Sequence, residues 1–283
     1  MAPKIVCVVG PTACGKTTLG VLLAKRFNGE VVSADSMQIY RGMTIGTAAP
    51  TAEEMDGVPH HMIAVADSTE QWSAARYART AIPVVDDILA RGRLPILVGG
   101  TGLWLDAVVQ GRTFASGAAG GEVRQKLQQR LEREGIQPLL EELRQVDPEA
   151  AERLHPADEK RILRALEVYA ETGETISAHN KKTAALPPRY DAVWIGLQFE
   201  ERAEMKALID RRVDAMVEEG LLEEVMGLLK SGLPRDATAL QAIGYKEFLG
   251  VAEGTATVDQ AVAEVKLRSR QYAKRQLTWL RRN

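Results

Sequence analysis

The chain has 283 residues, of which 45% are hydrophobic and 26% are charged, and its formal net charge is −2. This balance is typical of a soluble protein with one large domain, or with a core domain that carries an insertion. No apolar run reaches the ~18 residues that a membrane-spanning helix needs, and the strand-like start does not look like a signal peptide. Cys7 and Cys14 allow neither a disulfide framework nor a zinc site, so we expect a cytoplasmic protein.

Strand-like and helix-like segments alternate over the first 114 residues, which predicts an α/β fold with a parallel sheet flanked by helices. The first helix is expected to bury Leu19, Leu22, Leu23 and Phe27 on one side, and the second to start or kink at Pro83. The expected strands are residues 4–9, 30–34 and 94–98, and the expected helices are residues 17–27 and 73–91.

The composition and the residue pattern of the sequence change after about Phe114. A small-residue linker at 115–121 leads into a charged, Leu-rich helical stretch at 122–172, in which Pro138, Pro148 and Pro156 mark breaks or helix starts. Strand texture returns only at 192–197, after a proline-bearing break at 184–189. The sequence therefore predicts a core of residues 1–114 and 187–283, interrupted by an all-helical insertion at 115–186. The remaining helices are expected at 201–230, 239–251 and 258–281.

The segment from Gly10 to Thr17 matches the P-loop pattern G-x-x-x-x-G-K-[ST] at every fixed position, between a strand and a helix. In a P-loop, backbone N–H groups and the helix N-terminus hold phosphate oxygens, and the lysine adds a mobile cation. The alternative is a chance match in an ordinary strand-to-helix turn. Strand 94–98 ends in glycines, without the aspartate that simple NTPases use for Mg²⁺. This favours a kinase-like transferase in which a second substrate meets the phosphates.

Candidate residues for the acceptor side follow the other strands, because ligands bind at the carboxyl edge of such a sheet. Asp35 follows strand 30–34 and could accept a proton, but it could equally cap a turn. Thr101 lies in a glycine-rich turn, where it could contact an acceptor or only close the turn. Arg212 lies on a charged helix, where solvent exposure is the simpler expectation, and we favour a structural role for His60 and His61.

The C-terminal stretch from Val265 carries seven basic residues and no acidic one, with two aromatic residues among them. A solvated helix face would account for this pattern, but a basic stripe with aromatics more often marks a polyanion site. The basic residues are Lys266, Arg268, Arg270, Lys274, Arg275, Arg281 and Arg282, and the aromatic residues are Tyr272 and Trp279.

These motifs, in this order, resemble the tRNA dimethylallyltransferases, also called isopentenyl-tRNA transferases. The resemblance runs through most of the chain, and its Asp-Ser-x-Gln-x-Tyr segment, Gly-Gly-Thr-Gly turn and Lys-Arg-Gln-x-Thr-Trp tail are far more specific than a P-loop alone. The matching segments are GPTACGKT from Gly10, SADSMQIYRGMTIGT from Ser33, VPHH from Val58, LPILVGGTGLWL from Leu94, DEKRILRALEVY from Asp158, RRVDAMVEEGLLEEV from Arg211, AIGYKE from Ala242 and KRQLTWLR from Lys274.

The resemblance implies transfer of a dimethylallyl group from its diphosphate to the exocyclic amine of the adenosine just 3′ of the anticodon, in tRNAs that read codons beginning with U. It implies that the P-loop holds this diphosphate rather than ATP, with Mg²⁺ on Thr17. Asp35 matches the family's base, Thr101 the residue that hydrogen-bonds at the acceptor adenine, and Arg212 the arginine near adenine and diphosphate. The implied diphosphate contacts are Gly10, Thr12, Ala13, Cys14, Gly15, Lys16 and Thr17.

By the same match, tRNA contacts are implied in four segments, and the helical insertion would clasp the anticodon arm. The target base must leave the stack of the anticodon loop to enter the pocket. The implied tRNA-contacting residues are Asp35, Ser36, Met37, Gln38, Thr101, Lys160, Arg161, Arg164, Gln241, Gly244, Tyr245, Lys246, Lys274, Arg275, Gln276, Trp279 and Arg281.

The chain departs from the family pattern at three points. Cys14 replaces the usual serine and could make the loop sensitive to oxidation, and Ala49 replaces a common lysine, so one phosphate contact could be missing. The chain lacks the zinc-finger tail of eukaryotic relatives, which implies a bacterial-type enzyme, expected to be monomeric. Two rival functions stay open: a small-molecule kinase, which would turn over ATP without RNA, and a non-enzymatic RNA-binding module.

Overall fold

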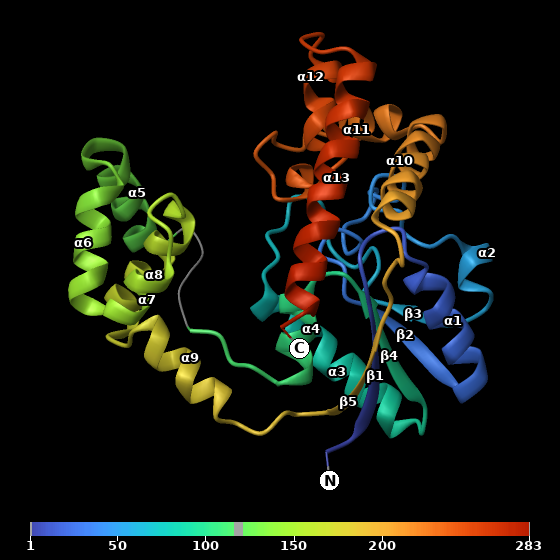
Figure 1. Cartoon of the computed structure of the whole chain (residues 1–283), viewed down its shortest axis with the longest axis horizontal. Helices are drawn as coiled ribbons and strands as arrows, with labels where there is room; N and C mark the ends of the chain where they lie inside the picture. Colours follow the sequence, from blue (N-terminus) through green and yellow to red (C-terminus); the bar gives the residue numbers. More distant parts are fainter. Residues whose placement is uncertain (1, 116–120, 283) are drawn as a thin grey trace. The chain divides into compact units, whose positions relative to one another are not determined.

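A five-stranded parallel sheet forms the centre of the larger part of the chain (Figure 1). The computed structural model describes residues 2–115 and 121–282, and it divides the chain into a unit of residues 1–111 and 188–283 and a unit of residues 112–187. The strand order is β3-β2-β4-β1-β5, which confirms the predicted α/β class. The strands are β1 (Lys4–Val9), β2 (Gly29–Ser33), β3 (His60–His61), β4 (Leu94–Gly99) and β5 (Asp191–Gly196).

Both faces of the sheet are buried, because successive side chains of a strand point to opposite sides. Val8 and Ile96 pack with residues of helix α1 (Lys16–Phe27) on one face. Their neighbours Cys7 and Leu97 are equally buried, and helices α3 (Ala74–Ala90) and α4 (Gly102–Val109) contact β4 and each other. The continuous apolar character of the strands follows from this two-sided covering.

Helix α1 buries only part of the side that was expected. Leu19 and Leu23 pack against the core, but Leu22 and Phe27 are 59% and 57% exposed, and Gly20, Val21 and Ala24 are buried. A Cβ atom at Gly20 would collide with Val98, so small residues allow the helix to approach the sheet closely. The prediction was wrong for Leu22 and Phe27 because it followed residue size.

The edge strand β3 is short and was not predicted, and it supports the structural role expected for the histidines. His61 Nε2 lies 2.7 Å from the carboxylate of Glu30, which is only 2% exposed. Glu30 also accepts hydrogen bonds from Arg91 (2.8 Å) and Arg93 (2.9 Å), just before β4. These bonds hold the pKa of Glu30 well below its ordinary value, at about 2, and they join three neighbouring strands at one end of the sheet.

After β5, two predicted helices prove to be broken. The segment 201–230 forms two helices separated at Gly220, whose φ of 100° suits glycine, and the segment 239–251 forms two 3-10 turns and one short helix. Pro83, by contrast, lies inside a continuous helix α3. The elements are α10 (Arg202–Glu218), α11 (Leu221–Lys230), η1 (Ala239–Gln241), η2 (Lys246–Phe248), α12 (Leu249–Ala252) and α13 (Val258–Leu280), with the short α2 (Ala52–Met55) earlier in the chain.

Residues 112–187 form the second unit, which is helical throughout its described part. Its core is built of leucines such as Leu139, Leu143 and Leu166. Buried Asp147 caps α7 through Ala150 N (3.1 Å) and accepts a second bond from Ser177 N (3.0 Å). The predicted linker at 115–121 lies largely outside the described residues. The helices are α5 (Glu122–Glu134), α6 (Ile136–Val146), α7 (Pro148–Arg153), α8 (Glu159–Thr172) and α9 (Ile176–Ala184).

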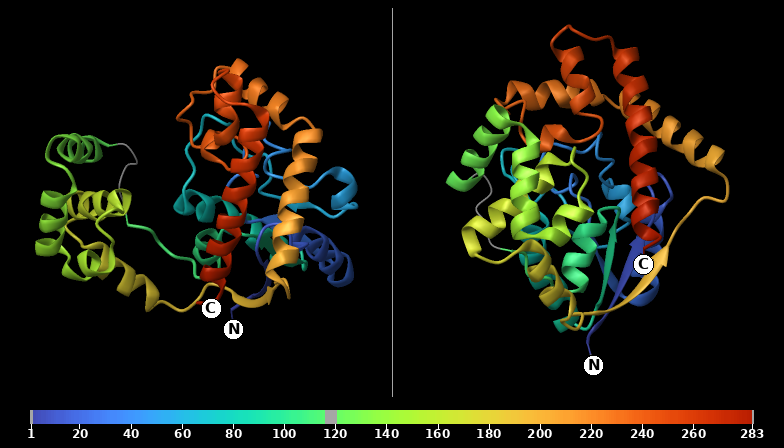
Figure 2. Two further views of the ribbon diagram at one scale, coloured as in Figure 1. Left: turned by 45° about the horizontal axis from the view of Figure 1, so that its top comes forward. Right: turned by 60° about the vertical axis from the view of Figure 1, so that its left-hand side comes forward.

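Helices α10 and α13 contact each other and run side by side (Figure 2). Within the described ranges, no helix combines the length and the apolar character that crossing a membrane requires.

Candidate active site

Three loops meet at the carboxyl edge of the sheet because their strands are neighbours in the order β2-β4-β1. The loop after β4 lies between the P-loop, which follows β1, and the Asp35 segment, which follows β2. Ala34 N donates to Val98 O (2.8 Å) and Thr101 N donates to Ala34 O (3.3 Å). A side chain at Gly99 would collide with the backbone of Ala34, so the contact requires glycine there.

The P-loop turns into α1 through two residues in the left-handed region, Ala13 (φ 64°) and Gly15 (φ 82°). The ammonium group of Lys16 donates to Pro11 O at 2.6 Å, inside the curve of its own loop. Burial lowers the pKa of Lys16, and the nearby guanidinium of Arg212 lowers it further. An anion placed here would relieve both effects.

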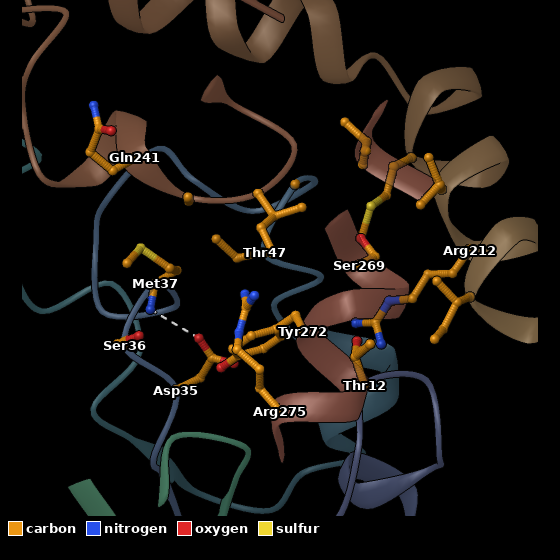
Figure 3. Close-up of a pocket in the computed structure, with 17 residues that line it drawn as sticks. Thr12, Asp35, Ser36, Met37, Thr47, Arg212, Gln241, Ser269, Tyr272 and Arg275 are labelled. Carbon is orange, nitrogen blue, oxygen red and sulfur yellow. Dashed lines mark hydrogen bonds between the residues drawn. The ribbon is translucent and has the colours of Figure 1, made fainter. Parts of the chain in front are cut away.

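The carboxylate of Asp35 both caps a turn and lines a pocket. Its Oδ1 accepts a hydrogen bond from Met37 N at 2.9 Å (Figure 3), so the turn-capping alternative is correct for this oxygen. The side chain nevertheless lines a pocket. The other oxygen therefore remains available to a ligand.

Thr101 lies beside Asp35 and contacts the residue that follows it. Its Oγ1 accepts from Ser36 N at 3.2 Å and lies 3.4 Å from Ser36 Oγ, to which it donates. Thr101 precedes α4 without a side-chain capping bond. Its hydroxyl thus joins the β4 loop to the Asp35 segment.

Arg212 points from α10 into the same pocket (Figure 3), so the expectation of a solvent-exposed side chain is wrong. Burial lowers the pKa of its guanidinium. It forms no ion pair or hydrogen bond with any residue that the structure describes, and only the longer-range attraction of carboxylates such as Asp35 and Glu54 opposes the effect of burial. A desolvated cation held this loosely indicates a site for an anionic ligand.

The pocket has a volume of about 240 Å³ and two kinds of wall. The loops after the strands contribute Thr12, Asp35 and Ser36, while α10 and α13 contribute apolar side chains together with polar ones such as Arg212 and Tyr272. Helix α13 contributes at intervals of three and four residues, as one helix face must. The lining residues are Thr12, Asp35, Ser36, Met37, Gly46, Thr47, Ile209, Arg212, Val213, Met216, Gln241, Ala242, Ile243, Val265, Ser269, Tyr272 and Arg275.

Tyr272 was noted in the sequence only as an aromatic residue in the basic stretch, yet it lies in the pocket beside Asp35 (Figure 3). Burial and the Asp35 carboxylate raise its pKa to about 12. The phenol therefore stays protonated and can donate a hydrogen bond. The guanidinium of Arg275 lies 5.6 Å from the centre of the ring. In the sequence, the only indication of this placement is that Tyr272 lies three residues before Arg275 and so shares a face of the helix with it.

A carboxylate on α11 organises the pocket wall at residues 44–47, which the sequence did not indicate. Glu224 accepts hydrogen bonds from Thr44 N (2.8 Å), Ile45 N (3.0 Å) and Gly46 N (3.1 Å), and from the hydroxyl of Tyr245. A side chain at Gly46 would collide with the Tyr245 ring. The wall is therefore fixed from behind by residues that do not line the pocket.

Several residues implied as tRNA contacts are committed to the interior instead. Tyr245 is fully buried and bonds to Glu224, and Gly244 N donates to Glu247 at 2.8 Å. Gln38 donates to Thr47 O (3.3 Å) and Ala48 O (3.1 Å), so it braces the pocket wall. Burial of Tyr245 and Gly244 argues against a surface contact there, whereas Gln38 is half-buried and stays a candidate. By contrast, Gln241 and Lys246 are exposed.

The basic stretch on α13 separates into paired and unpaired charges. Lys266 pairs with Asp214 (2.5 Å), Arg268 with Glu264 (2.6 Å) and Arg270 with Asp210 (3.1 Å). Toward the end of the helix, four cations have no acidic partner among the described residues, and all four are exposed. They are Lys274, Arg275, Arg281 and Arg282.

In the helical unit, the three implied tRNA contacts all lie in the first two turns of α8. Lys160 and Arg161 are exposed. Arg164 instead pairs with buried Glu167 (2.7 Å) and donates to Ala115 O (3.0 Å). A structural role accounts for Arg164 within its own unit.

Two further expectations concern Cys14 and a metal. Burial raises the pKa of the Cys14 thiol, which disfavours the thiolate and argues against a site sensitive to oxidation. In residues 2–115 and 121–282, no group of three or more His, Cys, Asp or Glu side chains could enclose a metal ion. A Mg²⁺ ion here would need ligand oxygens from its substrate, which is how phosphate-bound Mg²⁺ is commonly held.

Comparisons with known proteins agree with this arrangement. A model of the IPP transferase family matches residues 38–283. The tRNA dimethylallyltransferase of Caldanaerobacter subterraneus subsp. tengcongensis is 48% identical over 282 residues, covering 99% of this chain and 90% of that protein. The solved full-length tRNA isopentenylpyrophosphate transferase of Bacillus halodurans is 46% identical, with a TM-score of 0.72 over 99% of this chain and 87% of its own.

A solved eukaryotic dimethylallyltransferase acting on tRNA is 30% identical, with a TM-score of 0.83 over 99% of this chain and 70% of its own. The structural likeness therefore persists at this lower sequence identity. With the family match over most of the chain and relatives of high identity over nearly all of it, this chain belongs to the IPP transferase family.

Proposed function

We propose that this chain transfers a dimethylallyl group from dimethylallyl diphosphate to the exocyclic amine of the adenosine just 3′ of the anticodon, in the pocket between the P-loop and α13. One observation carries the proposal. A single pocket joins the P-loop residue Thr12, the carboxylate of Asp35 and the unpaired cation of Arg212. These are the groups needed for a departing anion on one side and a departing proton on the other.

The diphosphate would lie on the P-loop, between Lys16 and Arg212. When the allylic C–O bond breaks, negative charge grows on the leaving diphosphate, and fixed cations stabilise that charge best in a desolvated site. Burial lowers the pKa of both cations, so an anion bound between them would stabilise their charged forms. A Mg²⁺ ion would be held by Thr17 and the diphosphate oxygens, where it would neutralise leaving-group charge.

The acceptor amine would lie next to Asp35 and Thr101. Its lone pair is delocalised into the adenine ring, and a carboxylate is too weak a base to deprotonate it beforehand. The free oxygen of Asp35 can accept a hydrogen bond from the amine and take its proton as the C–N bond forms. Thr101 and Tyr272 would orient the base, since the Thr101 hydroxyl contacts Ser36, the neighbour of Asp35, and the Tyr272 phenol lies near the Asp35 carboxylate.

The five-carbon group would lie against the apolar wall formed by Ile209, Val213, Met216 and Val265.

The tRNA would reach the pocket over the unpaired cations of α13, Lys274 and Arg275 among them. Phosphate contacts of this kind supply much of the affinity for nucleic acid. Lys160 and Arg161 of the helical unit are the contacts we propose there. We further propose a monomer in the cytoplasm, a reducing compartment in which free thiols such as Cys7 and Cys14 persist.

Incubation with radiolabelled dimethylallyl diphosphate and bulk tRNA, without ATP, tests the proposal. We expect label in the tRNA fraction and none when the Lys16→Ala variant is used. A small-molecule kinase would instead consume ATP without RNA and leave the tRNA unlabelled, and that result would refute the proposal.

A further inference from the structure

Two motifs that lie far apart in the sequence fit each other in the fold. A side chain at Gly100 would collide with the amide of Gln276, and a side chain at Gly102 would collide with the indole of Trp279. Gln276 and Trp279 are three residues apart on α13 and share a face. The glycine-rich turn after β4 therefore lacks side chains at the points where this face of α13 packs against it.

Both the oxygen and the nitrogen of the Gln276 side-chain amide form hydrogen bonds at this contact between α13 and the loops. The side chain is only 6% exposed. Its Oε1 accepts a hydrogen bond from Thr12 N at 2.9 Å, and its Nε2 donates to Gly100 O at 3.3 Å. One side chain thus connects α13 to the P-loop and to the neighbouring loop, and a surface contact with tRNA is not available to it.

The bond to Thr12 lies next to the most strained residue of the P-loop. Ala13 has a φ of 64°, a conformation that costs a non-glycine residue about 1 kcal/mol or more. Such a conformation persists only where the surroundings hold it. Gln276 fixes the Pro11–Thr12 peptide, one peptide unit before the one that leads into Ala13, without bringing charge to a loop that must receive an anion.

We propose that Gln276 is a positioning residue of the reaction, which holds the P-loop in its diphosphate-binding conformation from α13. The inference rests on the proposed role of the P-loop as the diphosphate site. It assigns Gln276 to the donor side, whereas the family resemblance implies a contact on the tRNA side. The two roles differ in which ligand loses affinity when the side chain is removed.

The test measures two affinities for each variant: inorganic pyrophosphate with Mg²⁺ by calorimetry, without tRNA, and bulk tRNA by filter binding. For Gln276→Ala we expect pyrophosphate affinity to fall about tenfold, the loss typical of a buried amide left without its partner, and tRNA affinity to stay unchanged. Gln271→Ala is the matched control, because Gln271 is an exposed glutamine on the same helix. It should change neither affinity.

A second variant guards against a simple folding defect. Gly100→Ala should displace the Gln276 amide and weaken pyrophosphate binding in the same way. Because both changes remove one hydrogen-bonded joint, the double variant should bind no more weakly than the worse single variant. Additive losses would contradict the proposal.

The remaining outcomes separate the inference from the proposal on which it rests. Weaker tRNA binding with unchanged pyrophosphate affinity in Gln276→Ala would overturn the inference, and so would no change in either affinity. If Lys16→Ala binds pyrophosphate as tightly as the unaltered protein, the P-loop is not the diphosphate site and the proposed function itself fails.

Discussion

Charge removal from the end of α13 should weaken tRNA binding in a way that charge removal from its middle does not. Lys274 and Arg275 are exposed and unpaired, whereas Lys266 and Arg268 are each held by an acidic side chain at 2.5–2.6 Å. The double variants Lys274→Ala/Arg275→Ala and Lys266→Ala/Arg268→Ala change the net charge equally. Only the first should release fewer counterions when tRNA binds.

The magnitude follows from the number of phosphates contacted. The slope of log affinity against log salt is negative, and each lost contact reduces its steepness by about 0.7–0.9. Two lost contacts therefore reduce the steepness by about 1.4–1.8, which corresponds to a fall in affinity at 0.1 M salt of about 25–60-fold. Filter binding of tRNA between 0.05 and 0.3 M salt would measure both quantities (roughly the range over which such slopes are linear). An equal fall in both double variants, or an unchanged slope in the first, would refute the assignment of the tRNA surface to the end of α13.

Three further predictions concern single side chains. Arg212→Met should raise the free energy of unfolding by about 1 kcal/mol, because a desolvated cation that forms no hydrogen bond or ion pair with the described residues is removed, yet lower kcat/KM by about 10²–10³-fold; a loss of both stability and activity would contradict this. Glu224→Gln should cost about 1–3 kcal/mol in urea unfolding, since an amide nitrogen would face backbone donors, whereas exposed Glu223→Gln should cost nothing. Glu30→Gln should cost about 2 kcal/mol at neutral pH, less than a fully buried ion pair. Because the pKa of Glu30 falls from 4.5 to about 2 on folding, its contribution is present above pH 4.5 and is lost as pH falls toward 2; the variant should show a flatter loss of stability over that window, and an unchanged acid profile would disprove the role of Glu30.

The sheet and the loops at its edge could be predicted because local patterns determine them. A β-branched run followed by a P-loop pattern fixes strand, turn and helix together. The neighbouring positions of the Gly10, Asp35 and Thr101 loops then follow from the rule that parallel strands present their carboxyl ends at one edge. Arg212 came only from the family resemblance, since its own helix pattern favoured solvent.

The direction in which helical residues point could not be predicted, because distant partners decide it. The sequence shows seven basic residues after Val265, on α13 and just beyond its end, but the acids that neutralise two of them, Asp210 and Asp214, lie on α10. Gln276 belongs to a basic motif, yet Gly100 draws it inward. Tyr245 likewise turns inward to Glu224. Motif membership indicated that these residues matter, and the tertiary contacts determined what they do.

The most direct test of the central claim is single-turnover transfer of labelled dimethylallyl to tRNA by the Asp35→Asn variant. Asparagine keeps the oxygen that accepts from Met37 N, so the turn is preserved while the proton acceptor is lost. The account predicts a rate lower by about 10²–10⁴-fold, with unchanged affinity for tRNA. A transfer rate equal to that of the unaltered protein would show that Asp35 does not take the proton and would contradict the account.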